Sequence, residues 1–166
     1  MPGIGTELFE SIQASLPELK PWLPWVHDPH LSEETVEAEA RRAHARFLTR
    51  DDLRYHMFLR ENGRIIGGTG LHRINWSVPS FEIGYWVDSR HTGKGYALEA
   101  AAGLTDFAFD RLKARRVEIR CDSLNARSKA IPEKLGYHLE GELHNFMVAF
   151  DDPTQLRNIL VYAKTQ

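Results

Sequence analysis

The residues best suited to chemistry form a glycine-rich turn, Arg90-His91-Thr92-Gly93-Lys94-Gly95-Tyr96-Ala97. It lies between a strand-like run, Phe81 to Val87, and an amphipathic helix expected from about Gly95 to Leu112. A turn that opens a helix presents unpaired backbone N–H groups and the positive end of the helix dipole. Glycine lets an anion approach the backbone closely because it has no Cβ. The turn therefore predicts an anion site, most often one for a phosphate.

Two common phosphate signatures do not fit this turn. A Walker-type loop needs Ser or Thr after its Gly-Lys pair, and here Gly95 follows Lys94. A dinucleotide turn needs a third glycine where this chain has Leu98. The pattern that remains is Arg-x-x-Gly-x-Gly-x-Ala, supplied by Arg90, Gly93, Gly95 and Ala97. This short pattern also fits an ordinary strand-to-helix turn. The segments downstream are therefore needed to distinguish a phosphate-binding loop from such a turn.

Those segments follow in a recognisable order. Val117–Cys121 reads as a strand, Asn125-Ala126-Arg127-Ser128 follows it, and a short helix ends at Lys134-Leu135-Gly136-Tyr137. This order resembles the GNAT (Gcn5-related) N-acetyltransferases over roughly Leu8 to Ala163. Phe81–Trp86, Leu139–Gly141 and the aromatic Lys20–Trp25 segment resemble more narrowly the RimJ/RimL branch, which acetylates protein N-termini and small amines. The resemblance implies an α/β (α+β) GNAT fold with a mixed central sheet of six to seven strands, splayed at the cofactor site and flanked by about four helices.

Hydrophobic spacing and turn residues predict the elements that position the turn. Besides the helix after the turn and the short helix before Tyr137, helices are expected over 6–16 and from a Ser32 cap to Thr49. Strands are expected over 53–60, 64–74, 80–87, 117–121, 137–148 and 156–163. The prolines at 17, 21 and 24 should end the first helix in a stiff loop, and Gly67, Gly68 and Gly70 indicate a bulge or close backbone approach.

The front of the chain departs from the family pattern. Family members usually begin with an edge strand, but only residues 1–5 precede the first expected helix here. That strand is expected to be reduced or lost, which exposes a sheet edge that a second copy of the chain would cover. A homodimer is therefore expected.

Composition limits the class of protein. The 166 residues suit one domain, 1–166, and 42% hydrophobic with 27% charged residues is ordinary for a globular protein. A net charge of −2 gives no footprint for nucleic acid or a membrane surface, and no run of residues is long and apolar enough to span a membrane. One cysteine excludes an internal disulfide and fits a reducing compartment, so a cytoplasmic enzyme is expected.

The resemblance implies acetyl-CoA as co-substrate, and it assigns residues to hold it. Loop amides would hold the pyrophosphate, with added charge from Arg90. The strand end at Trp86–Asp88 would splay from its neighbour and pair with the pantetheine amide. Asn125 would touch the pantetheine, cap the next helix, or do both. The expected cofactor-binding residues are Trp86, Val87, Asp88, Arg90, Gly93, Lys94, Gly95, Tyr96, Ala97, Asn125 and Ser128.

The catalytic groups are less sharply indicated. Many family members carry a tyrosine that protonates the leaving thiolate, but here that position is Pro132. Ser128 is then the candidate acid, although a thiolate leaves without one near neutral pH. Glu82 is the candidate base, with an equal alternative in which its charge orients the acceptor or pairs with an arginine. Glu142 and His144 are further candidates.

Several other residues have simpler readings. Cys121 is expected to be buried, and Tyr137 is expected to pack. His27 and His30 lack a third ligand nearby, so no metal is expected. Trp22, Trp25 and Trp76 would wall the acceptor cleft or fill the core, and the loops 20–30 and 73–80 would choose the acceptor.

The function implied is transfer of acetyl from acetyl-CoA to a primary amine by direct attack in a ternary complex. The amine would belong to a protein N-terminus, a small amine or an amino acid. The alternative is a CoA-binding module with little or no turnover that acts through a protein partner.

Overall fold

The computed structural model describes residues 2–166, which form a single mixed sheet with helices on both faces. The strands are β1 (Leu53–Phe58), β2 (Ile65–Asn75), β3 (Ser80–Val87), β4 (Arg116–Asp122), β5 (His138–Val148) and β6 (Leu156–Thr165). The helices are α1 (Gly5–Leu19), α2 (Glu33–Thr49), α3 (Tyr96–Asp110) and α4 (Ala126–Lys134), with short 3-10 turns at Pro24–His27 and Ser89–His91. Among residues 2–166 the sheet has six strands in the order β1-β2-β3-β4-β6-β5, and only β3 and β4 are parallel neighbours.

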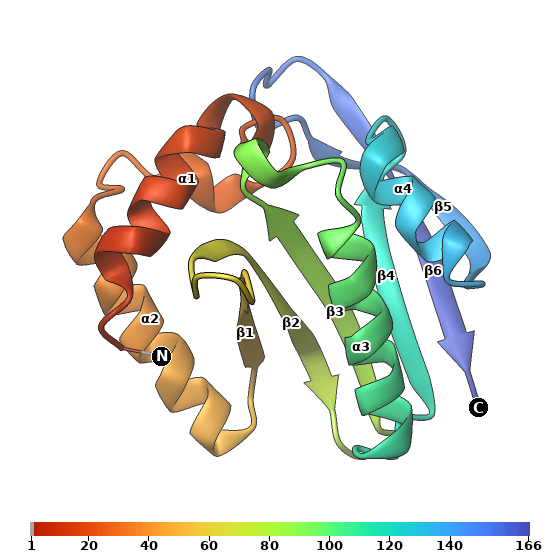
Figure 1. Ribbon diagram of the computed structural model, residues 1–166. Helices are drawn as coiled ribbons and strands as arrows, with labels where there is room; N and C mark the ends of the chain where they lie inside the picture. The colour runs from red at the N-terminus through yellow and green to blue at the C-terminus, as the bar shows by residue number, and fades with distance from the viewer. Residues whose placement is uncertain (1) are drawn as a thin grey trace.

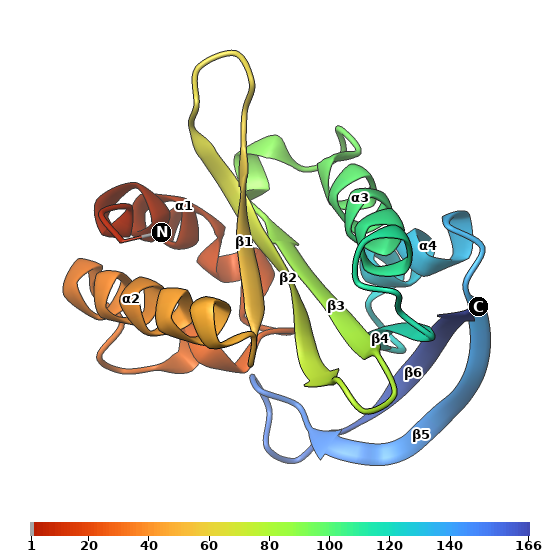
Figure 2. The ribbon, with the colours of Figure 1, turned by 90° about the horizontal axis from the view of Figure 1, so that it is seen from below.

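The helices are sorted by sheet face. α1 and α2 lie together over β1 and β2, while α3 and α4 lie on the opposite face (Figure 1). The view from below shows the sheet passing between these two pairs (Figure 2). Each strand therefore offers alternate side chains to different helix pairs.

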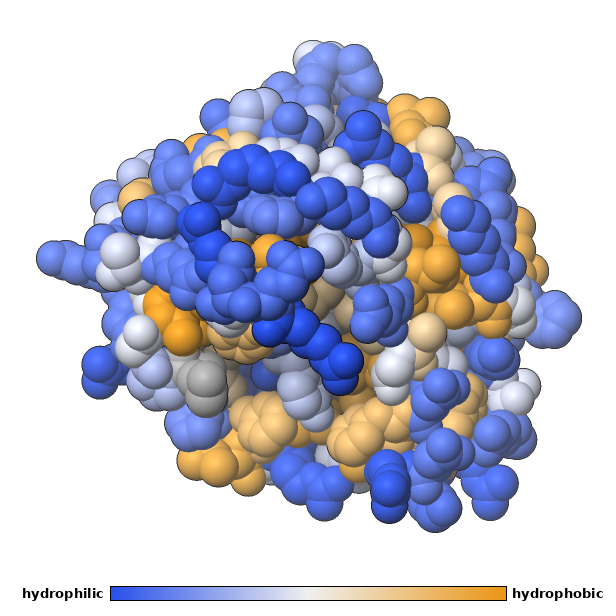
Figure 3. Space-filling view, in the orientation of Figure 1, coloured by the Kyte–Doolittle hydropathy of each residue, from blue (hydrophilic) through white to orange (hydrophobic). Residues whose placement is uncertain are grey.

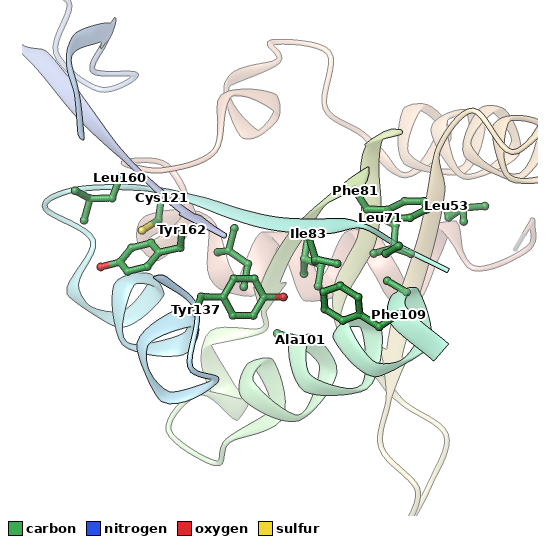
Figure 4. Packing of buried hydrophobic residues seen from close by; sticks show 14 residues of the cluster. Leu53, Leu71, Phe81, Ile83, Ala101, Phe109, Cys121, Tyr137, Leu160 and Tyr162 are labelled. Atoms are coloured by element: carbon green, nitrogen blue, oxygen red, sulfur yellow. The ribbon is translucent and has the colours of Figure 1, made fainter. Parts of the chain in front are cut away.

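The main core lies between the sheet and α3 and α4. Phe81 and Ile83 of β3 are each 2% exposed and pack with Ala101 and Phe109 of α3 (Figure 4). Tyr137 is in the same cluster, and its hydroxyl lies 2.7 Å from the buried Thr105 hydroxyl, so its expected packing role is confirmed. This core fixes α3, and with it the turn that opens α3, against β3.

The first two helices follow the expected pattern with one exception. Ser32 and Thr35 form the capping box that starts α2. The expectation that Pro17 ends the first helix is wrong, because α1 runs on to Leu19 with Pro17 inside it. A proline within the last turn removes only one N–H of the helix ladder, and Lys20 N–H still bonds to the Leu16 carbonyl.

The sheet edge at β1 matches the expectation about the front of the chain. Within residues 2–166 the first element is α1, and β1 pairs only with β2. The register of that pair shifts between Met57 and Phe58, opposite Gly67. A Cβ on Gly67 would lie 2.3 Å from the Trp86 carbonyl oxygen, so the expected bulge and close approach are both present.

Candidate functional site

The parallel pair β3–β4 opens into a splay. Their register covers only Ser80–Glu82 against Arg116–Glu118, although both strands continue further. Asp88 N–H bonds to the Ile66 carbonyl on the β2 side at 2.8 Å. Backbone direction alternates along an antiparallel pair, so Tyr85 and Val87 direct their amide and carbonyl groups to the open side. Of the expected strand-end residues, Val87 thus offers free backbone groups to the splay, whereas the Asp88 amide is already bonded.

The glycine turn lies at the open end of this splay. Gly93 and Gly95 have φ of +78° and +86°, a conformation that favours glycine. The turn leads directly into α3, whose first backbone bond runs from Glu99 N–H to the Gly95 carbonyl. Within residues 2–166 the N–H groups of residues 93–98 have no hydrogen-bond acceptor. These free donors lie at a helix N-terminus, where the sequence predicts an anion site, and the anion site stays a prediction.

A buried ion pair shapes the start of the turn. Asp88 is fully buried, and its carboxylate accepts from the Arg90 guanidinium at 2.5 and 2.9 Å and from the Ser11 hydroxyl at 2.8 Å. Burial opposes ionisation of Asp88, but the bonds from Arg90 outweigh it and lower its pKa to about 2. The Arg90 guanidinium, which was expected to face the pyrophosphate, is thus bonded to Asp88. Because Ser11 of α1 donates to the same carboxylate, Asp88 also connects the turn to α1.

The loop after β4 brings two expected residues to the splay. The Asn125 side chain accepts from Ser128 N–H at 3.0 Å and caps α4, as one of its two readings proposed. Ser128 Oγ lies 3.2 Å from the Tyr85 hydroxyl, which also donates to the Ser128 carbonyl at 3.1 Å. Burial raises the pKa of Tyr85. Tyr85 thus bridges β3 to α4 across the opening, a role that sequence reasoning missed.

On the other face of β3 a cavity of about 480 Å³ opens under α1 and α2. Its floor carries glycines of β2 and β3, Gly68 and Gly84, with Trp86 beside them. Its walls include Leu8, Ile12, Leu23, Trp25, Leu31 and Val36, and its polar groups include Asp28, Glu39, Arg42, Arg54, His56 and His72. The 20–30 loop contributes Leu23, Trp25 and Asp28, whereas the 73–80 loop, expected to help choose the acceptor, contributes no lining residue.

Glu82 lies on the cavity face but outside the lining. Its Oε2 is 3.4 Å from the Nε atoms of both Arg73 and Arg120, and its side chain is 19% exposed. The structure therefore shows the arginine pairing that was one reading of this residue. Oε2 is buried and accepts no hydrogen bond within residues 2–166.

A histidine–carboxylate pair in the cavity was missed by sequence reasoning. His72 Nδ1 lies 2.7 Å from Asp52 Oδ2, and His72 lines the cavity. Strand alternation places His72 on the same face as Glu82, its register partner in β3. That signal was available from the sequence, but the contact with Asp52, which comes just before β1, was not.

The structure also places the tryptophans and the cysteine for which the sequence predicted a role. Trp25 lines the cavity and packs on Trp86, with ring centroids 5.9 Å apart. Trp76 instead packs on Phe81, away from the cavity. Cys121 is buried as expected, and burial raises the pKa of its thiol to about 11. Across residues 2–166 there is no group of three or more His, Cys, Asp or Glu side chains that could hold a metal ion.

Sequence comparison decides the family. A model of the acetyltransferase (GNAT) domain matches residues 6–138. The chain belongs to the GNAT acetyltransferase family. It is similar to YdaF of Bacillus subtilis (strain 168), which is named as a ribosomal N-acetyltransferase, with 30% identity over 145 residues, 85% of this chain and 76% of that protein. It is also 32% identical over 77 residues to the ribosomal-protein-serine acetyltransferase of Escherichia coli (strain K12), covering 46% of this chain and 43% of that protein.

Solved structures support the same GNAT fold. A RimL ribosomal L7/L12 alpha-N-protein acetyltransferase in complex with coenzyme A superposes with a TM-score of 0.88 at 20% identity, over 98% of this chain and 88% of that one. A second structure, of a probable acetyltransferase, superposes with a TM-score of 0.89 at 23% sequence identity. The match covers 99% of this chain and 89% of that one. The mixed sheet, its splay and the four helices therefore match the GNAT architecture implied by the sequence.

The surface of this family member is mostly polar on the face seen in Figure 1. Hydrophilic side chains predominate there, with apolar side chains in separate patches (Figure 3). Among the helices of residues 2–166, none has both the length and the apolar character needed to cross a membrane.

Proposed function

We propose that this GNAT family member transfers an acetyl group from acetyl-CoA to a primary amine in a ternary complex. One observation carries the proposal: the two faces of β3 serve two openings. On one side lies the splay with the free amides of residues 93–98, and on the other lies the cavity beneath α1 and α2. A co-substrate in the first opening and an acceptor in the second would meet at β3.

The anion site fits the pyrophosphate of coenzyme A. Free backbone N–H groups at Gly93, Gly95 and Ala97, with the dipole of α3, favour a doubly charged group without needing Arg90. Lys94 and Tyr96 contribute the amides between them. The backbone of Tyr85 and Val87 is free to pair with the pantetheine amides in the manner of a missing strand.

Residues at the splay suit the departure of a thiolate. The Ser128 hydroxyl donates a hydrogen bond to the leaving sulfur, and the Tyr85 hydroxyl holds Ser128 in place by donating to its carbonyl. Since burial raises the pKa of Tyr85, this phenol stays protonated at neutral pH and acts as a hydrogen-bond donor. Pro132, buried in α4, occupies the usual place of the acidic tyrosine without a proton to give.

The acceptor is a protein N-terminal α-amine. Relatives named for ribosomal proteins support this choice among primary amines. The cavity supports it too, because its aromatic and aliphatic walls suit the apolar first residue of a peptide, and the Asp28 carboxylate lies in the same lining.

The test combines a coenzyme A titration with a thiol-release assay. Acetyl-CoA is supplied with tetrapeptides that begin with Ser or Ala, with polyamines and with free amino acids. Binding with turnover on the peptides supports the proposal, and turnover on small amines alone contradicts the acceptor. Binding without turnover on any amine favours the CoA-binding module, for which Pro132 is the motivating observation.

A matched pair of glycine variants tests the anion site. Gly95→Val places a β-branched residue at φ +86°, which displaces the amides, so coenzyme A should bind at least about tenfold more weakly. Gly103→Ala lies further along α3, where a Cβ would meet no atom within 4 Å, and it should bind like the parent. Equal affinities for all three proteins would place the pyrophosphate elsewhere.

The free edge of β1 supports a homodimer. β1 pairs only with β2 among residues 2–166, and an unpaired edge is a template for another strand. Light scattering should then give twice the mass of one chain, and a single-chain mass would contradict the dimer.

A further inference from the structure

We propose that His72, oriented by Asp52, is the general base that takes the proton from the acceptor amine. The inference rests on the proposed acetyl transfer and names the group that accepts the proton. His72 comes from β2 and lines the cavity, opposite Glu82 in the register of β2 and β3. Its imidazole reaches Gly84, which lies just beyond Glu82, the last residue of β3 in register with β4.

The contact with Asp52 fixes which ring nitrogen is free. A carboxylate only accepts hydrogen bonds, so Nδ1, 2.7 Å from Asp52 Oδ2, carries the proton in the neutral ring. Nε2 then keeps its lone pair, as a general base requires. When Nε2 gains a proton, the carboxylate stabilises the imidazolium.

Glycines make room for the ring. A Cβ on Gly70 would lie 2.6 Å from His72 Nε2, and a Cβ on Gly84 would lie 3.3 Å from the same atom. The imidazole therefore lies across a strip of backbone without side chains. Its Nε2 is held over the stretch of β3 where the splay starts, which is where the two proposed substrates meet.

Charged neighbours leave His72 as the free base of this face. Glu82 is engaged by Arg73 and Arg120. Glu39, on α2, pairs with Arg42, Arg46 and Arg54, and the last two arginines also act on Asp52. The remaining charged lining group is Asp28.

The second histidine of the cavity is a weaker base. Burial lowers the pKa of His56 to about 4. Its Nδ1 is buried, and within residues 2–166 it has no hydrogen-bond partner. His72, whose Nδ1 is held by Asp52, is therefore the better-placed proton acceptor of the two.

The proposed step balances. The amine nitrogen forms a bond to the carbonyl carbon, the carbon–sulfur bond breaks, and coenzyme A leaves as its thiolate beside Ser128. The amine proton moves to His72 Nε2 and then to solvent. The products are an N-acetyl group and coenzyme A.

The experiment compares His72→Gln, Asp52→Asn and a control, His44→Gln, which changes an exposed histidine of α2. For each protein we would measure the affinity for coenzyme A by titration and the rate of acetyl transfer to tetrapeptides that begin with Ser or Ala, over a range of pH. His72→Gln should keep its coenzyme A affinity within about twofold and lose on the order of 10²-fold in kcat. Added imidazole should partly restore a His72→Ala variant, and His44→Gln should match the parent.

Asp52 acts as a positioning residue, so its readout is the tautomer of His72. In Asp52→Asn, kcat should fall while the affinity for coenzyme A stays within about twofold of the parent. Nitrogen-15 NMR should show the proton of neutral His72 on Nδ1 in the parent and a mixture of tautomers in Asp52→Asn.

The outcomes separate this inference from the proposed function. If the parent is active and His72→Gln keeps more than about a third of its kcat, the base is not His72 and only this inference falls. The same holds if Glu82→Gln abolishes turnover while His72→Gln does not. If the parent fails to bind coenzyme A or to acetylate any amine, both proposals fall.

Discussion

Replacing Asp88 by Asn should weaken the whole protein, because the carboxylate joins α1 to the glycine turn. A folded-state pKa of about 2, against an ordinary value of 3.8, corresponds to roughly 2 kcal/mol of stabilisation at neutral pH. Asn keeps the shape but loses the charge opposite Arg90, and its NH₂ group faces donors. Breaking one side of a buried pair typically costs about 3–5 kcal/mol, so we expect a loss of about 2–4 kcal/mol.

Urea unfolding followed by circular dichroism measures this loss of free energy. In a thermal scan, where each kcal/mol shifts the melting temperature of a chain of this size by about 2–4 °C, the melting temperature should fall by roughly 5–15 °C. Asp106→Asn, which changes an exposed carboxylate of α3, serves as the control and should stay within about 0.5 kcal/mol of the parent.

The pH dependence gives the sign of the effect. The folded-state pKa of Asp88 is lowered, so its contribution is complete above pH 3.8 and is lost as the pH falls towards about 2. The gap between parent and Asp88→Asn should therefore be constant at neutral pH and close on acidification through that window. A variant as stable as the parent at pH 7, or a gap that widens in acid, would refute the reasoning.

Three further perturbations have outcomes that the contacts determine. Ser32→Ala removes the capping box of α2 and should cost about 1 kcal/mol in urea unfolding, with a larger effect than an exposed serine elsewhere. Cys121 should resist iodoacetamide at pH 8 in the folded protein and react once the protein is unfolded, because burial raises the pKa of its thiol to about 11. Mass spectrometry measures the labelling, and rapid labelling of the folded protein would contradict this. Tyr85→Phe removes both contacts to Ser128 and should cost about 1 kcal/mol while raising the KM for acetyl-CoA, whereas an unchanged KM would exclude the bridge from the site.

Local signals were enough to predict the elements and the turn. The cap at Ser32, the alternation along 80–87 and the paired glycines at 93 and 95 depend on neighbours in sequence, and the structure has each of them. The extension of α1 past Pro17 shows the limit of such rules, since one lost N–H bond does not end a helix whose other bonds and packing persist.

The contacts that complete the site were beyond the sequence because they join distant segments. Asp88 meets Ser11 across 77 positions, and Tyr85 meets Ser128 across 43. Sequence alone assigned Arg90 a charge without showing that Asp88 would engage it. Likewise, alternation gives the face of His72, but only folding brings Asp52 to its ring.

β3 borders both of the proposed substrate sites. Its odd-numbered residues Phe81 and Ile83 build the core that anchors α3, and Tyr85 continues this face towards α4. Gly84 and Trp86 on the opposite face line the cavity, and so does Tyr85. Since β4 leaves the register beyond Glu82, the splay and the cavity both border β3. A side chain at Gly84 would crowd the imidazole of His72, so the glycine that weakens a strand leaves room for this ring between the proposed substrate sites.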